Sequence, residues 1–215
     1  MTEQAAGERV AQAARVAAMV PGAAQMRALG VRLAGLLRPG DLVVLAGPLG
    51  AGKTTLVQGI GDGLGVRGPI TSPTFVIARV HPSLRGGPDL VHADAYRLGS
   101  RLEVDDLDLD ADTDHAVTVV EWGAGLVENL VPGHLLISIG WAAHDGGAGR
   151  ASDESAGASG GAAGASGGAA GPSDESARSA GEGPGDEPRI VTVAGYGERW
   201  RSVAGELSAV LSGAA

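Results

Sequence analysis

Residues 42–54 read LVVLAGPLGAGKT, five apolar residues that run directly into a glycine-rich loop. Residues 47–54 fit the phosphate-loop pattern G-x-x-x-x-G-K-[ST]. Glycines let the backbone wrap closely around phosphates and aim successive N–H groups inward. The N-terminus of a following helix attracts the same anion. The segment therefore predicts a buried strand, a phosphate-binding turn and a helix.

Lys53 is the only lysine, although the chain has 16 Lys and Arg residues together. An ammonium is a compact point charge on a slim stem, whereas a guanidinium is broad and planar. We expect Lys53 to reach the β- and γ-phosphates of a nucleotide and the Thr54 hydroxyl to bind Mg²⁺. The predicted nucleotide-binding residues are Gly47, Gly50, Ala51, Gly52, Lys53, Thr54 and Thr55.

Apolar periodicity and turn residues divide most of the chain into helices and strands. We predict helices over residues 23–37, 53–64 and 198–211, and strands over 42–46, 75–80, 90–94, 116–120, 135–141 and 189–194. Strands that alternate with helices around a phosphate loop indicate an α/β P-loop NTPase. We expect three α/β/α layers with a mixed, largely parallel central sheet.

Two segments differ from this pattern. Residues 1–20 are Ala-rich and weakly patterned, which predicts a flexible N-terminal arm. Residues 142–188 contain no Leu, Ile, Val or aromatic side chain with which to offset the entropy of ordering. We therefore predict a single domain over residues 21–215, interrupted by a disordered Gly/Ala/Ser-rich insertion at 142–188.

Composition excludes several kinds of protein. The 215 residues include no cysteine, which rules out disulfides, Cys-ligated zinc and a thiol nucleophile. A formal charge of −9 argues against direct binding of DNA or tRNA. No apolar run approaches the roughly 18 residues that a membrane span needs. We expect no membrane partner and a cytoplasmic location.

Acidic residues end two of the predicted strands. Glu121 closes residues 116–120 in the Walker-B pattern, and Asp94 closes residues 90–93. The carboxyl ends of parallel strands meet at one edge of a sheet, so both acids should approach the phosphate loop. We expect Glu121 to be the second Mg²⁺ ligand and Asp94 to orient water or the ion. Alternatively, Asp94 forms a surface pair with His92.

Residues 70–75 read ITSPTF and follow the helix predicted over residues 53–64. At this position P-loop enzymes carry a switch segment that senses the γ-phosphate. Ser72 and Thr74 supply hydroxyls there, although an ordinary turn explains the segment equally well. Guanine readout through N-K-x-D is excluded because the only lysine lies in the phosphate loop, which makes ATP the expected nucleotide. The predicted catalytic set is Lys53, Asp94, Glu121 and Thr74.

Four motifs together resemble one family. They are residues 47–55, 71–75 (TSPTF), 92–98 (HADAYRL) and 120–123 (VEWG). In their order and spacing they are similar to TsaE, also called YjeE, the small bacterial ATPase of tRNA threonylcarbamoyladenosine synthesis. The resemblance covers roughly residues 20–141 and 189–211.

The resemblance implies that residues 72–75 form the switch, that Asp94 matters for ATP turnover and that Glu121 lies at Mg²⁺. It also implies ATP hydrolysis in support of TsaB and TsaD, with tRNA touched only indirectly. We therefore expect a Mg²⁺-dependent ATPase stimulated by partners. A P-loop small-molecule kinase and a non-enzymatic ATP-sensing module remain alternatives. Arg97 either stabilises charge in catalysis or forms a structural ion pair.

Overall fold

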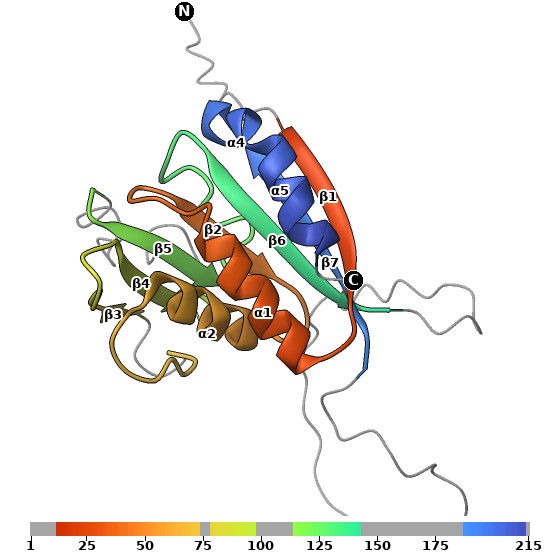
Figure 1. Ribbon diagram of the computed structural model, residues 1–215, viewed down its shortest axis with the longest axis horizontal. Helices are drawn as coiled ribbons and strands as arrows, with labels where there is room; N and C mark the ends of the chain where they lie inside the picture. The colour runs from red at the N-terminus through yellow and green to blue at the C-terminus, as the bar shows by residue number, and fades with distance from the viewer. Residues whose placement is uncertain (1–11, 74–77, 98–113, 143–186, 214–215) are drawn as a thin grey trace, which may run out of the picture.

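The computed structural model describes residues 12–73, 78–97, 114–142 and 187–213, which form a seven-stranded sheet and helices (Figure 1). The strand order across the sheet is β1-β7-β6-β2-β5-β4-β3. The elements in chain order are β1 (Gln12–Val20), α1 (Ala23–Ala34), β2 (Leu42–Ala46), α2 (Lys53–Leu64), β3 (Ala78–His81), β4 (Asp89–Asp94), β5 (Ala116–Glu121), β6 (His134–Trp141), β7 (Arg189–Tyr196), α4 (Glu198–Ser202) and α5 (Ala204–Ser212).

The centre of the sheet is parallel. Strand β2 pairs in parallel with β5 on one side and β6 on the other, and β5 pairs in parallel with β4. Strand β3 adds to β4 in antiparallel fashion, and β7 and β1 extend the other edge in the same way. The register places Glu121 opposite both Leu45 and Asp94, so three strands end together beside the phosphate loop. The predicted α/β class with a mixed sheet is confirmed.

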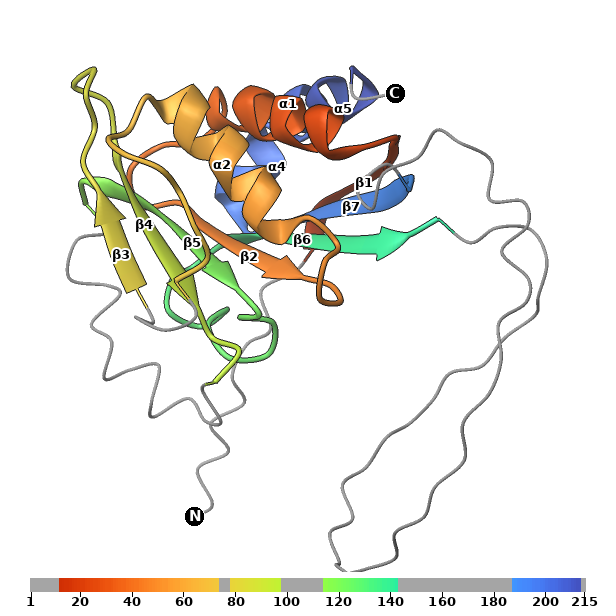
Figure 2. The same ribbon diagram turned by 90° about the horizontal axis from the view of Figure 1, so that it is seen from below.

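The helices of the described residues all pack against one face of the sheet (Figure 2). Their buried side chains join a single core cluster that includes Leu29 of α1, Leu56 of α2, Trp200 of α4 and Leu207 of α5. The opposite face carries a smaller cluster, in which Val127 and its neighbours in residues 122–133 cover β2, β4 and β5. Residues 98–113, which connect β4 to β5, lie outside the described residues.

Helices α1 and α2 approach each other through glycines. A Cβ on Gly59 would lie 2.0 Å from the carbonyl oxygen of Arg27, and one on Gly30 would lie 2.3 Å from that of Leu56. Side chains at these two positions would push the helices apart. The close approach holds α2, and with it the phosphate loop, firmly against α1.

The expected flexible arm over residues 1–20 is wrong for its second half. Gln12–Val20 forms β1, which pairs with β7 from Gln12 opposite Tyr196 to Val20 opposite Arg189. This strand is stabilised by a partner far along the chain, which a local pattern cannot show. Residues 1–11 lie outside the described residues.

The expected insertion, residues 142–188, also lies almost wholly outside the described residues. The strands on either side of it, β6 and β7, pair in antiparallel fashion, with Trp141 opposite Arg189. The helix expected over residues 198–211 is divided at Val203 into α4 and α5, because Val203 has a non-helical φ of −115°. The first helix ends at Ala34 rather than at Leu37.

Candidate nucleotide-binding site

The phosphate loop connects β2 to α2 and has the backbone geometry that its glycines permit. The φ angles are 142° at Gly47, 78° at Gly50 and 106° at Gly52, a region in which other residues are strained. A Cβ on Gly47 would also lie 2.2 Å from the carbonyl oxygen of Ile139 in β6. Position 47 therefore requires glycine both for its positive φ and for its close approach to β6.

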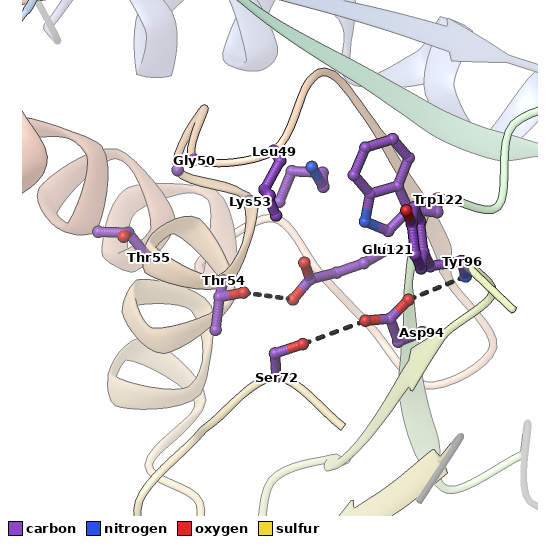
Figure 3. A pocket seen from close by; sticks show the side chains of 11 residues that line it. Leu49, Gly50, Lys53, Thr54, Thr55, Ser72, Asp94, Tyr96, Glu121 and Trp122 are labelled. Atoms are coloured by element: carbon purple, nitrogen blue, oxygen red, sulfur yellow. Dashed lines mark hydrogen bonds between the residues drawn. The ribbon is translucent and has the colours of Figure 1, made fainter. Parts of the chain in front are cut away.

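A pocket of about 420 Å³ opens at this loop, at the carboxyl ends of β2, β4 and β5 (Figure 3). It is large enough for a nucleotide-sized ligand. The residues that line it are Leu49, Gly50, Gly52, Lys53, Thr54, Thr55, Ser72, Asp94, Tyr96, Glu121 and Trp122.

Lys53 begins α2 and is only 5% exposed. Its Nζ donates hydrogen bonds to the carbonyl oxygens of Gly47 at 2.8 Å and Pro48 at 2.9 Å, and lies 3.7 Å from the ring centroid of Trp122. Burial lowers the pKa of Lys53, while the nearby carboxylates of Glu121 and Asp94 act in the opposite direction. The ammonium is thus held inside the loop by neutral acceptors and an aromatic face.

Glu121 ends β5 and is 3% exposed. The Thr54 hydroxyl donates a hydrogen bond to its Oε1 at 2.8 Å. The Nε2 atom of His92, a fully buried residue of β4, lies 2.9 Å from the same oxygen. A hydroxyl from α2 and a carboxylate from β5 therefore meet at the base of the phosphate loop.

Asp94 ends β4 beside Glu121 and is 4% exposed. Its Oδ2 accepts a hydrogen bond from the Ser72 hydroxyl at 3.1 Å, and its Oδ1 accepts one from the Tyr96 backbone N–H at 2.9 Å (Figure 3). Asp94 thereby connects the start of the expected switch segment to the pocket. The alternative of a surface pair with His92 is wrong, because both side chains are buried.

Most of the predicted site residues come together in this pocket. Lys53, Asp94 and Glu121 line it, as do Gly50, Gly52, Thr54 and Thr55 from the loop and helix. Gly47 and Ala51 belong to the loop without lining the pocket, and Ala51 is completely buried, with its N–H directed to the Pro48 carbonyl at 3.3 Å. Thr74 lies outside the described residues.

Sequence reasoning gave no binding or catalytic role to Trp122, Tyr96 or His92. Trp122 and Tyr96 both line the pocket, with ring centroids 5.1 Å apart. Trp122 has a φ of 61° and is the only non-glycine residue with positive φ among those the structure describes. His92 contacts Glu121 directly. The sequence could have indicated this, because side chains two residues apart in a strand share a face and Asp94 was already a candidate site residue.

The donor set suits Mg²⁺ bound together with a nucleotide. This ion is typically held by one or two carboxylates, phosphate oxygens and several waters rather than by an all-protein cage. Thr54 and Glu121 offer a hydroxyl and a carboxylate 2.8 Å apart. Within the described ranges no cluster of three or more His, Cys, Asp or Glu residues could enclose a metal.

The sheet order, the phosphate loop and the acids at the strand ends define a protein with the P-loop NTPase fold. The crystal structure of YdiB from Bacillus subtilis shares this fold, with a TM-score of 0.59 and 23% identity over 91% of this chain and 95% of that one. A family model described as "Threonylcarbamoyl adenosine biosynthesis protein TsaE" matches residues 20–149. The chain belongs to the TsaE family.

Several bacterial relatives carry the same name, "tRNA threonylcarbamoyladenosine biosynthesis protein TsaE". The protein of Streptomyces coelicolor is 51% identical over 81% of this chain and 93% of its own length. That of Mycobacterium tuberculosis is 52% identical over 54% of this chain and 73% of its own length.

None of the helices in the described part of the chain is long and apolar enough to cross a membrane.

Proposed function

We propose that this protein binds ATP with Mg²⁺ in the pocket at the phosphate loop and hydrolyses it. The observation that carries the proposal is the contact between the Thr54 hydroxyl and the Glu121 carboxylate beside the buried ammonium of Lys53. This combination places a cation, a hydroxyl ligand and an acid within one pocket, at the N-terminus of α2. The same three groups serve phosphoryl transfer in P-loop enzymes.

Each group has a distinct part in this chemistry. Backbone N–H groups of the loop and the N-terminus of α2 bind the phosphate oxygens. A triphosphate attracts the ammonium of Lys53 more strongly than its present carbonyl partners do, so Lys53 neutralises charge on the β- and γ-phosphates. Thr54 and Glu121 would hold Mg²⁺, which when bound neutralises charge that develops on the phosphate oxygens. Asp94, which also lines the pocket, would orient the attacking water.

We further propose that ATP turnover supports tRNA threonylcarbamoyladenosine synthesis in the cytoplasm through TsaB and TsaD. Membership of the TsaE family and the names of the relatives support this role. The formal charge of −9 suits a protein that acts on protein partners and contacts tRNA only indirectly.

Measurement of ATP consumption tests both proposals. The protein is assayed alone, with TsaB and TsaD, and with candidate small-molecule acceptors. We expect slow release of phosphate by the protein alone and faster release with the two partners, since groups added by a partner can be worth about 10³–10⁵ in rate. Transfer of phosphate to an acceptor without any effect of the partners would instead show a kinase. ATP binding without turnover in any mixture would show a sensing module.

A further inference from the structure

The buried histidine beside Glu121 has no part in the proposed chemistry so far. His92 lies in the middle of β4, is 0% exposed and has Val119 of β5 as its register partner. Its strand neighbours on the same face are Leu90 and Asp94. Its one polar contact within the described residues joins Nε2 to Oε1 of Glu121 at 2.9 Å, and its Nδ1 is buried without a hydrogen-bond partner there.

The contacts indicate where the ring proton lies. A buried N–H group without an acceptor is rarer and more costly than a buried acceptor without a donor. A proton on Nε2 satisfies this preference, because Nε2–H then donates to Oε1 of Glu121 and Nδ1 keeps only a lone pair. His92 then serves as a hydrogen-bond donor to the carboxylate.

Two donors from two elements thus meet at one oxygen. Thr54 of α2 and His92 of β4 both donate to Oε1 of Glu121, at 2.8 and 2.9 Å. Oε2 accepts no hydrogen bond from any residue in the described part of the chain. Of the two donors, Thr54 is also a proposed Mg²⁺ ligand, so His92 is the donor whose only contact in this site is the carboxylate.

We propose that His92 is a positioning residue that fixes the Glu121 carboxylate through Oε1 and so presents Oε2 to the Mg²⁺–ATP complex. This inference rests on the proposed function. Groups that orient a metal ligand from behind typically change metal affinity or activity by about 10–100-fold when they are removed. The loss of His92 should therefore affect Mg²⁺-dependent steps and leave metal-free nucleotide binding unchanged.

The test compares His92→Leu with His92→Gln in the full-length protein. Leu fills a similar volume without a donor, whereas the Gln amide nitrogen reaches the position of Nε2. Calorimetry gives the Kd for ATP with Mg²⁺ and with EDTA. We expect His92→Leu to reduce the affinity gained from Mg²⁺ by about tenfold and kcat by about 10–100-fold, with the EDTA value unchanged. His92→Gln should recover most of both losses.

A Glu121→Gln background provides the control. If His92 acts through the carboxylate, His92→Leu should cause no further loss of Mg²⁺-dependent binding there. Should His92→Leu show no cooperative thermal transition, His92→Asn replaces it, because its amide is too short to reach Oε1. His92→Asn is then expected to lose the Mg²⁺ effect that His92→Gln keeps.

The outcomes separate this inference from the function on which it rests. Wild-type protein that binds no ATP, with or without Mg²⁺, would overturn the proposed function. Wild-type protein with Mg²⁺-dependent binding, and a folded His92→Leu or His92→Asn variant that matches it, would overturn the positioning role alone. Equal losses with Mg²⁺ and with EDTA would show that His92 supports only the fold.

Discussion

At the scale of single residues, the surroundings of Lys53 favour lysine over arginine. It is buried, it contacts two carbonyl oxygens and an aromatic ring, and the rest of the chain uses arginine for its cations. The pocket leaves room for a slim ammonium between the loop and Trp122, and a planar guanidinium has a different shape and hydrogen-bond geometry. The confined, buried position of residue 53 therefore suits the ammonium of a lysine.

Replacement of Lys53 by Ala is expected to weaken ATP binding by about 100-fold, because a charged hydrogen bond of about 3 kcal/mol is lost. Calorimetry with Mg²⁺ and ATP measures the change. Lys53→Arg is the matched variant, and it should also bind poorly if the compact shape matters. Wild-type affinity in Lys53→Ala would contradict the role of the ammonium.

Glu121→Gln separates binding from turnover. The amide keeps an oxygen for the Thr54 hydroxyl and removes the negative charge. We expect the Kd for ATP measured with EDTA to change little and kcat measured with Mg²⁺ to fall by about 100-fold, since the charge acts on the Mg²⁺-dependent steps and matters most in the transition state. Asp62→Asn, on the exposed side of α2, is the control and should leave both quantities unchanged. Equal losses of binding and turnover would refute the assignment.

We expect the buried His134 to make the free energy of unfolding depend on pH. It is 5% exposed and its ring stacks on Tyr196 with centroids 4.6 Å apart. Burial lowers its pKa below the ordinary value of 6.5, as it also does for His81. Below about pH 6.5 the unfolded chain binds protons that the folded protein does not, so the free energy of unfolding should fall as the pH falls.

Urea denaturation at about pH 7.5 and about pH 5.5 measures this slope. His134→Phe keeps an aromatic ring against Tyr196 and removes the titrating group. It should reduce the difference between the two pH values and leave the part due to His81. An unchanged difference would exclude His134 as a source.

At the scale of elements, the pair α1–α2 determines where the phosphate loop lies. The two helices meet at Gly30 and Gly59, where added Cβ atoms would overlap the facing backbone. An ion pair between Arg27 and Asp62 also joins them at 2.6 Å, but both side chains are about half exposed and such pairs contribute little. Close packing of backbone against backbone therefore stabilises the interface between α1 and α2 more than this ion pair does.

Gly59→Ala should therefore destabilise the protein, although alanine ordinarily stabilises a helix. Overpacking of this kind costs about 1–3 kcal/mol. Gly205 in α5 is the control, because a Cβ there would meet nothing within 4 Å. Gly205→Ala should raise the free energy of unfolding by about 0.5–1 kcal/mol. Chemical denaturation compares the two variants, and a stabilised Gly59→Ala would contradict the packing.

At the scale of the whole molecule, the sheet continues across a long sequence separation. Strands β6 and β7 pair up to Trp141 and Arg189, which places the two ends of residues 142–188 side by side. Strand β1 then pairs with β7 on its other side, and α5 packs against the same core as α1. The fold therefore depends on the strands that flank the inserted segment.

Deletion of residues 146–185 is expected to preserve the fold and ATP binding. Residues 142–145 and 186–188 remain to connect β6 to β7. Loop-closure entropy changes by about 0.6 kcal/mol for each halving of length, so the free energy of unfolding should rise by about 1–2 kcal/mol. Denaturation and calorimetry measure the two properties. Loss of cooperative unfolding or of ATP affinity would show that the segment does more than connect strands.

The sequence by itself predicted the α/β class, the buried strand at Leu42–Ala46, the helix at Lys53–Leu64 and the loop between them. These features follow from neighbouring residues, since glycines, one lysine and an apolar run specify local backbone geometry. The order of motifs also indicated the TsaE family. Asp94 and Glu121 could be predicted because each ends an apolar strand.

Only the tertiary structure decided that Gln12–Val20 is an edge strand and that Thr54, His92 and Glu121 meet at one carboxylate oxygen. The first depends on pairing with β7, and the second on the order and register of β2, β4 and β5 under α2. Contacts between distant segments arise from packing and pairing summed over the whole sheet. A local sequence pattern contains no information about these long-range contacts. The partner of a buried side chain is therefore known only when the positions of the strands are known.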